Sequence, residues 1–386
     1  MLKLILENYR AAPRKDKFPK IWPEFVGYQP DIQQIKRQFA PYEKYKNLIV
    51  VGNGGSISSL HGFWGALGGK SEKNLEIVST MEPDYLNYVE RKYRQDDTLV
   101  IAISKSGTTV GVLETLLALK NYPVLVITTI GEGTLSPMAQ SMGWPQIEHP
   151  SIGGRFTGRT AVAYGPAYLL GLDVAEIEKG AAAALGANLR SDGPAWRLAE
   201  FLFTADQNGY KEVFLPVYSQ FLIGFNHLIV QLMHESVGKE GKGQTVLAVD
   251  APESQHHTNQ RFFGGPKNMA GVFVTILEPH DDIDIDVPDK IGDIALRGGT
   301  VGDLRGAKLH HSLLCEARGT MADAKEQKIP LAHLEIDKIT PYSIGEYMVF
   351  WQFVAYFSAL LRDVNPLDQP QVERSKEISL ELRAKR

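Results

Sequence analysis

Short β-branched runs alternate with helical patterns between residues 47 and 128, and this alternation limits the fold more than any other feature of the chain. The pattern is typical of a parallel sheet covered by helices. Such a domain binds ligands at the carboxyl ends of its strands, so the loops that follow the strands are where chemistry is expected. We predict strands at Leu48–Val51, Leu75–Ser79, Leu99–Ser104 and Val124–Thr128, and helices near Ser56–Leu67, Pro83–Tyr93 and Val110–Lys120.

A second alternation of the same kind follows the alanine-rich helical stretch Val174–Leu189. Since 386 residues exceed the usual size of one hydrophobic core, the chain is expected to form two α/β domains. The segment Pro279–Asp303 is rich in Asp, Pro and Gly and is expected to loop out. The second set of elements is predicted at strand Glu212–Tyr218, helix Gln220–Glu235, strands Thr245–Asp250 and Val272–Leu277, a helix around Ser312–Gln327 and strand Leu331–Ile336.

We therefore divide the chain into four parts. Residues 1–45 form an N-terminal extension, residues 46–190 the first domain, residues 191–364 the second domain and residues 365–386 a C-terminal helix. Each domain is predicted to be a mostly parallel sheet between two layers of helices.

Composition and charge exclude several classes of protein. The net charge is −4 and basic residues are scattered, which argues against a nucleic-acid partner. Cys315 is the only cysteine, so an intramolecular disulfide and a Cys-rich zinc site are excluded. The apolar run Tyr347–Leu361 is shorter than the roughly 20 residues of a membrane span and is read as a buried core helix. Residues 1–14 lack the continuous apolar core of a secretory signal, so we expect a cytoplasmic protein without a membrane partner.

Two hydroxyl-rich and glycine-rich loops follow neighbouring predicted strands. Ser104-Lys105-Ser106-Gly107-Thr108-Thr109 opens a helix, where hydroxyls, backbone amides and the helix N-terminus converge in a way that suits a phosphate monoester. Gly54-Gly55-Ser56 follows the first strand, and glycine lets backbone amides approach an anion closely. Serine and threonine also cap helices very often, so each loop alone favours neither reading. The two loops together, at adjacent strand ends, favour a phosphate ligand.

Nucleotide motifs fail at both glycine clusters. Gly52-Asn53-Gly54 follows a strand, but Ile57 stands where a dinucleotide fingerprint needs its third glycine. The segment Gly238–Gly243 lacks the Gly-Lys-Ser/Thr ending of a mononucleotide loop and is read as a turn.

Candidate acid and base groups follow predicted elements of the second domain. Glu235 ends a helix, where a carboxylate opposes the helix dipole; an exposed helix-end glutamate is the commoner case, and catalysis is the alternative. A zinc motif starting at His234 fails because Gly238 replaces the second histidine. His256 and His257 lie in a polar loop after a strand, where one histidine is expected to move protons near neutral pH.

Two cations complete the set of candidates. Arg155 lies between two glycines and Phe156 in the connection between the predicted domains, where it would meet either an anionic intermediate or an inter-domain carboxylate. Lys376 lies on the polar terminal helix and, taken alone, is read as solvated.

The motifs, in this order, resemble the glucose-6-phosphate isomerase family, whose two domains share the sugar-isomerase fold. The resemblance covers roughly residues 45 to 380. Its most specific elements are Gly153-Gly154-Arg155-Phe156, Glu253-Ser254-Gln255-His256, Gly265-Pro266-Lys267, Pro341-Tyr342-Ser343-Ile344-Gly345-Glu346 and Asn365-Pro366-Leu367-Asp368-Gln369-Pro370.

The resemblance implies a role for each candidate and a reaction. The reaction is the interconversion of glucose 6-phosphate and fructose 6-phosphate through a cis-enediolate, in glycolysis and gluconeogenesis, with no metal and no cofactor. The resemblance also implies a homodimer in which the histidine reaches the neighbouring subunit's site. The implied roles are Glu235 as base, Arg155 as enediolate-stabilising cation, His256 and Lys376 in ring opening, and Gly55, Ser56, Ser104, Lys105, Ser106 and Thr109 around the phosphate.

Three other functions are alternatives to this isomerase activity. A dual-specificity isomerase that also acts on mannose phosphate differs only in small features around C2, so one sequence leaves it open. A non-catalytic sugar-phosphate sensor would need no proton-transfer set. A metal-dependent β-barrel isomerase is disfavoured by the α/β pattern.

Overall fold

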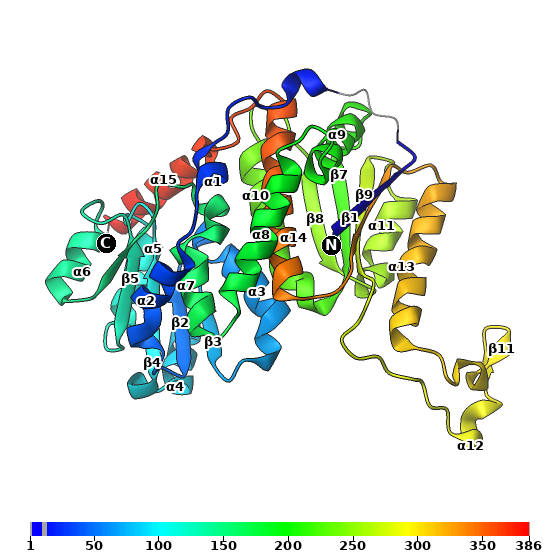
Figure 1. The fold of residues 1–386 in the computed structure, drawn as a ribbon, viewed down its shortest axis with the longest axis horizontal. Helices are drawn as coiled ribbons and strands as arrows, with labels where there is room; N and C mark the ends of the chain where they lie inside the picture. The colour runs from blue at the N-terminus through cyan, green and yellow to red at the C-terminus, as the bar shows by residue number, and fades with distance from the viewer. Residues whose placement is uncertain (1, 10–13, 386) are drawn as a thin grey trace.

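The protein is described by a computed structural model that covers residues 2–9 and 14–385. The described residues form two five-stranded sheets with helices on both faces, and a small hairpin (Figure 1). This architecture, together with the structural neighbours reported below, confirms the predicted α/β class with paired, mostly parallel sheets.

The first sheet is parallel throughout and has the order β3-β2-β4-β5-β6. Every residue of the three central strands is buried, as expected for a parallel sheet covered on both faces. Helices α4, α5 and α6 cover the outer face, and α3 and α7 pack on the inner one. The bounds are β2 Asn47–Val51, β3 Asn74–Val78, β4 Thr98–Ile103, β5 Val124–Thr128, β6 Gln146–Glu148, α3 Ser58–Leu67, α4 Pro83–Lys92, α5 Val110–Ala118, α6 Leu135–Met142 and α7 Ala161–Leu169.

The second sheet has the order β1-β12-β9-β7-β8, and only its edge strand β1 is antiparallel. Helices α11 and α13 cover its outer face. The bounds are β1 Leu2–Glu7, β7 Glu212–Tyr218, β8 Thr245–Asp250, β9 Met269–Ile276, β12 Leu331–Ile336, α11 Thr258–Gly264 and α13 Leu309–Glu326.

The N-terminal strand β1 therefore belongs to the second sheet, although residues 1–45 were assigned to a separate extension. Leu2 pairs with Ile336 and Glu7 with Leu331. The two described α-helices of this segment, α1 (Glu24–Gly27) and α2 (Ile32–Phe39), lie toward the first sheet in Figure 1. The four-part division of the chain stays a prediction, since strand pairing alone does not set domain boundaries.

The longest helix, α14 (Pro341–Leu361), lies in the core between the two sheets (Figure 1). It packs against α8 (Val174–Asn188), α9 (Pro194–Gln207) and α10 (Asn226–Val237). A Cβ on Gly345 would lie 1.9 Å from the carbonyl oxygen of Ile177, so α14 and α8 approach too closely for any larger residue. This contact gives the motif at 341–346 a packing role.

Helix α14 is also the one described helix that is long and apolar enough to cross a membrane. Of its most apolar window, 89% is buried inside the protein, and core helices of soluble proteins pass the same test. The observation is therefore weak evidence for a membrane span and fits the predicted core helix.

Two segments project from the body. The predicted loop at 279–303 holds α12 (Asp289–Gly292) and the hairpin of β10 (Ala295–Leu296) and β11 (Gly299–Thr300), and Figure 1 shows it reaching away from the second sheet. The terminal helix α15 (Glu373–Arg383) lies on the side of the first sheet. Its last residue, Arg383, pairs with Glu114 of α5 at 3.0 Å.

Candidate functional site

The loop between β4 and α5 brings together the predicted phosphate-binding hydroxyls. Ser104 Oγ lies 3.2 Å from Thr109 Oγ1, and Ser106 Oγ lies 2.9 Å from the Thr108 hydroxyl. Lys105 turns away from this cluster and donates from Nζ to the carbonyl of Ser151 at 2.9 Å. The hydroxyls bond to one another at the N-terminus of α5, where an anion oxygen would find donors and a favourable dipole.

Gly107 takes the left-handed conformation that this loop requires. Its φ is +64°, and its carbonyl accepts hydrogen bonds from the amides of Thr134 and Leu135. A side chain at this position would strain the backbone, which gives a local reason for glycine here. The loop after β5 therefore fixes the shape of the hydroxyl cluster.

The second glycine loop lies directly against the connection that carries Arg155. Gly54–Ser56 forms a 3-10 helix, η3, and Gly154–Arg159 forms another, η6. A Cβ on Gly55 would lie 2.1 Å from the carbonyl carbon of Gly154. Only glycine permits this approach, and it places Arg155 beside the loop that carries Gly55 and Ser56.

Arg155 and Glu235 form an ion pair between these two parts of the chain. Nη1 of Arg155 donates to Oε2 of Glu235 at 3.0 Å, and Nε donates to the Ser236 hydroxyl at 2.8 Å. The Arg155 side chain is 2% exposed, whereas that of Glu235 is 27% exposed. Burial lowers the pKa of Arg155 from its ordinary value, and the charge of Glu235 opposes this shift. The Arg155 side chain is therefore enclosed by protein, whereas the Glu235 carboxylate remains partly accessible to solvent.

Gln231 holds the other oxygen of Glu235, and the sequence analysis did not find it. Its Nε2 donates to Oε1 of Glu235 at 3.0 Å, and its own Oε1 accepts from Ser58 Oγ at 3.1 Å. The available signal was the spacing, because residues i and i+4 lie on one face of a helix. Both oxygens of Glu235 are therefore oriented by neighbours.

The segment after α14 closes over Arg155. Nη2 donates to the carbonyl of Pro366 at 2.6 Å, and Nη1 donates to Oε1 of Gln369 at 2.8 Å. Lys239 ties the same segment down through Asp368, at 2.7 Å. The motif at 365–370 thus bonds to Arg155, and Gln369 is a second site neighbour that the sequence analysis did not single out.

The structure does not bring His256 or Lys376 into contact with Glu235 or Arg155. His256 is exposed in the 3-10 helix Glu253–His256, just after β8. Lys376 is exposed on α15 and pairs with Glu373 of its own helix at 2.8 Å. The roles of these two residues stay predictions.

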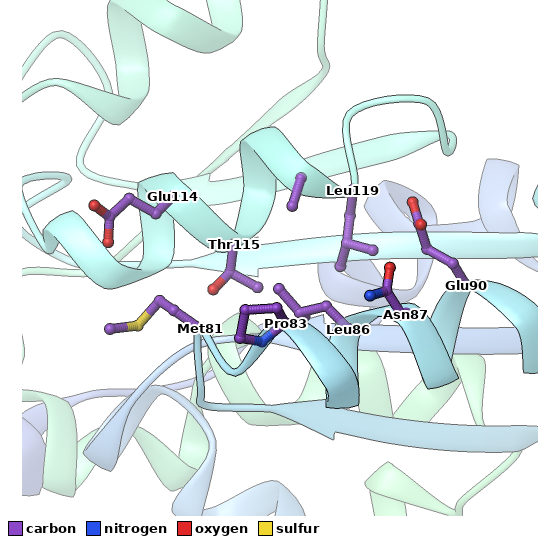
Figure 2. A pocket seen from close by; sticks show the side chains of 9 residues that line it. Met81, Pro83, Leu86, Asn87, Glu90, Glu114, Thr115 and Leu119 are labelled. Atoms are coloured by element: carbon purple, nitrogen blue, oxygen red, sulfur yellow. The ribbon is translucent and has the colours of Figure 1, made fainter.

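Two further observations concern metal ions and a surface hollow. Among residues 2–9 and 14–385, no group of three or more His, Cys, Asp or Glu side chains could hold a metal ion. A hollow of about 460 Å³ lies between α4 and α5, lined by residues that include Met81, Leu86 and Thr115 (Figure 2). It contains none of the predicted site residues, so it is separate from the candidate site.

Comparisons with known proteins bear on the family. No model of a protein family matches the chain. Over 360 residues the chain is 26% identical to a probable glucose-6-phosphate isomerase of Haloarcula marismortui, covering 90% of this chain and 80% of that protein. It is 27% identical over 357 residues to the glucose-6-phosphate isomerase of Symbiobacterium thermophilum, covering 86% of this chain and 78% of that one.

Solved structures show the same fold. A hypothetical protein of Thermus thermophilus matches with a TM-score of 0.84 and 25% identity, over 92% of this chain and 87% of that one. A glucose-6-phosphate isomerase of Chlamydia trachomatis matches with a TM-score of 0.77 and 20% identity, over 92% and 72%. These matches confirm the resemblance predicted from the motifs. In sequence and in fold, the chain is similar to glucose-6-phosphate isomerases.

Proposed function

We propose that the protein is a glucose-6-phosphate isomerase that interconverts glucose 6-phosphate and fructose 6-phosphate in glycolysis and gluconeogenesis. The observation that carries the proposal is the buried Arg155 beside the partly exposed Glu235, next to the Gly55 loop. The similarity to curated isomerases over 90% of the chain supports the same assignment.

The phosphate is proposed to bind at the first sheet. Ser104, Ser106 and Thr109 offer hydroxyls at the N-terminus of α5, and the neighbouring loop offers the Gly55 backbone amide and the Ser56 hydroxyl. Lys105 would have to leave the Ser151 carbonyl to contact the anion directly. Anchoring the phosphate positions the distant carbons C1 and C2 for reaction.

Glu235 is proposed to take a proton from C2 and return it to C1. Oε1 and Oε2 are held by Gln231 and Arg155, so the carboxylate is oriented before the substrate binds. The cis-enediolate that forms carries negative charge, and Arg155 stabilises this charge because it stays protonated and offers several donors. This interaction strengthens as the reaction proceeds, which is the requirement for catalysis.

Ring opening is assigned to His256 and Lys376, which would transfer protons at the ring oxygen and the anomeric hydroxyl. The exposure of His256 supports a homodimer in which it serves the neighbouring subunit's site. The adjacent His257 bonds to the hydroxyl of Thr258 at 2.7 Å, which favours His256 as the free proton carrier. A cytoplasmic location is part of the proposal.

A dual-specificity isomerase acting also on mannose 6-phosphate is the second candidate. Its proton transfer at C2 would use the same pair of Arg155 and Glu235. A sugar-phosphate sensor is disfavoured, since an oriented carboxylate beside a buried arginine serves no purpose in simple phosphate binding.

The decisive experiment is turnover of fructose 6-phosphate after exhaustive chelation, with glucose 6-phosphate and mannose 6-phosphate followed separately. We expect glucose 6-phosphate alone. Formation of both products would move the assignment to the dual-specificity class. No product, with fructose 6-phosphate still bound, would support the sensor, and activity restored only by added metal would contradict a metal-free reaction.

A further inference from the structure

Two histidines face each other where α3 of the first domain meets α10 of the second. The ring centroids of His61 and His227 lie 4.9 Å apart, and the ring planes are inclined by 34°. In the part of the chain that the structure describes, neither ring makes a hydrogen bond to a protein group. The pair is therefore free to bind something else.

The spacing of the rings fits joint coordination of one cation. With zinc–nitrogen bonds of about 2.0–2.1 Å, and about 1.2 Å from nitrogen to ring centre, each centroid lies roughly 3.2 Å from the metal. Angles between octahedral and tetrahedral then separate the two centroids by about 4.5–5.2 Å. The observed 4.9 Å lies inside this range.

The backbone around the pair is held rigidly. A Cβ on Gly224 would lie 2.3 Å from the carbonyl oxygen of His61, and one on Gly62 would lie 2.5 Å from the Phe225 ring. This close packing fixes the backbones that carry the two histidines relative to each other. His227 is exposed and His61 half-buried, which leaves room for water as further ligands.

We propose that His61 and His227 form a binding site for a divalent transition-metal cation of the Zn²⁺ type, bridging the two domains. Imidazole is a good ligand for zinc, nickel and copper, and copper is expected to bind most tightly of these. The site lies one helical turn from the Ser58–Gln231 hydrogen bond, so an occupant would hold together the same contact that orients Glu235. The inference does not depend on the isomerase assignment.

The test is equilibrium binding of Zn²⁺ to the full chain without sugar phosphate, measured by dialysis and metal analysis. The background variant carries His311→Gln and Cys315→Ser, because the exposed Cys315 Sγ lies 3.4 Å from the His311 ring and would bind zinc itself. We expect the background variant to bind one zinc per chain at this site. Adding His227→Gln should remove that zinc, and adding His61→Gln in its place should do the same.

The exposed position of His227 makes its variant the safer one for folding. Loss of even an outer-shell partner weakens metal affinity roughly 10–100-fold, so loss of a ligand should do at least that. His280→Gln is the matched control and should bind zinc like the background. Unchanged zinc binding in both His61 and His227 variants, or no zinc binding by the background protein, would overturn the proposal. Zinc should also raise the Tm of the background but not of the His227→Gln variant.

Discussion

Nη1 of Arg155 lies 3.0 Å from Oε2 of Glu235, and this bond joins the connection after the first sheet to the last turn of α10. The two residues are 80 positions apart in the sequence. Each residue has a second hydrogen-bond partner. Arg155 donates to the Pro366 carbonyl in the segment after α14, and Glu235 accepts from Gln231.

Replacing Glu235 with Gln should abolish isomerisation while binding of a phosphate ligand stays within a few-fold. The amide keeps the size of the side chain but cannot accept the C2 proton. Turnover of fructose 6-phosphate and ligand binding by calorimetry measure the two effects separately. Glu240→Gln, at an exposed turn, is the control and should keep full activity. Normal turnover in the Glu235 variant would remove this residue as the base.

Arg155→Lys should lower kcat by roughly 10²–10³, the usual effect of removing one donor to a developing anion. A lysine keeps the charge but loses the planar guanidinium group, which here donates to Glu235, Ser236 and the Pro366 carbonyl at once. Steady-state kinetics should show the loss mainly in kcat. Arg94→Lys, whose exposed arginine pairs with nearby Asp96, should leave kcat unchanged. A lysine variant with wild-type kcat would refute the proposed role.

Ser104→Ala combined with Thr109→Ala should chiefly raise KM for fructose 6-phosphate, because these hydroxyls are assigned to the phosphate and not to the reacting carbons. The two hydroxyls bond to each other at 3.2 Å, so removing both leaves no unpaired partner from that bond. Ser312→Ala on α13 serves as the control. An unchanged apparent affinity would place the phosphate elsewhere.

Gly55→Ala should destabilise the protein by about 1–3 kcal/mol, the usual cost of overpacking. The added methyl would lie 2.1 Å from the Gly154 carbonyl carbon and force η3 and η6 apart. Gly186→Ala is the matched control: it lies inside α8 with nothing within 4 Å of a new Cβ, so it should stabilise slightly. Urea unfolding measures both. Equal stability of the two variants would mean that the loops do not need this close approach.

His149 should make stability fall in mild acid. Burial lowers its pKa from the ordinary 6.5 to about 4. Between these values the unfolded chain binds the proton and the folded one does not, so stability is complete above pH 6.5 and is lost progressively down to pH 4. The loss amounts to at most about 3 kcal/mol. His149→Gln should reduce the dependence of the urea midpoint on pH over this range without abolishing it, because burial also lowers the pKa of His61 to about 4. The exposed His311→Gln should leave the dependence unchanged. A His149 variant with the same dependence as the wild type would assign the effect to other groups.

Most strands were predictable because buried parallel strands are short apolar runs bounded by polar loops. Thr245–Asp250, for example, begins and ends where the pattern places it. The predicted helix Gln220–Glu235 is instead a 3-10 helix, Gln220–Phe225, followed by α10, because Gly224 packs directly on the His61 backbone. Tertiary contact, which the sequence pattern does not encode, decides that boundary.

The candidate site was predictable only in part. Loops after neighbouring strands must meet at one sheet edge, so the hydroxyl cluster followed from pattern alone. Gln231 escaped because a neutral amide on a helix carries no motif chemistry, and its bond to Glu235 appears only in the folded chain. Gln369 lies inside the motif at 365–370, but its own contact with Arg155 forms only when the segment after α14 folds back. For His256 and Lys376, a single chain holds no contact that tests the roles implied by the resemblance.

The position of β1 also governs the order in which the chain can fold. Its partner β12 lies more than three hundred residues further along, so the first strand made has no place in the sheet until the ribosome has released nearly the whole chain. The first sheet draws its strands from residues 47–148 and faces no such delay. Contacts so distant in sequence are slow to form because a long loop must close first. The pairing of β1 with β12 is therefore expected to be the last step in forming the second sheet.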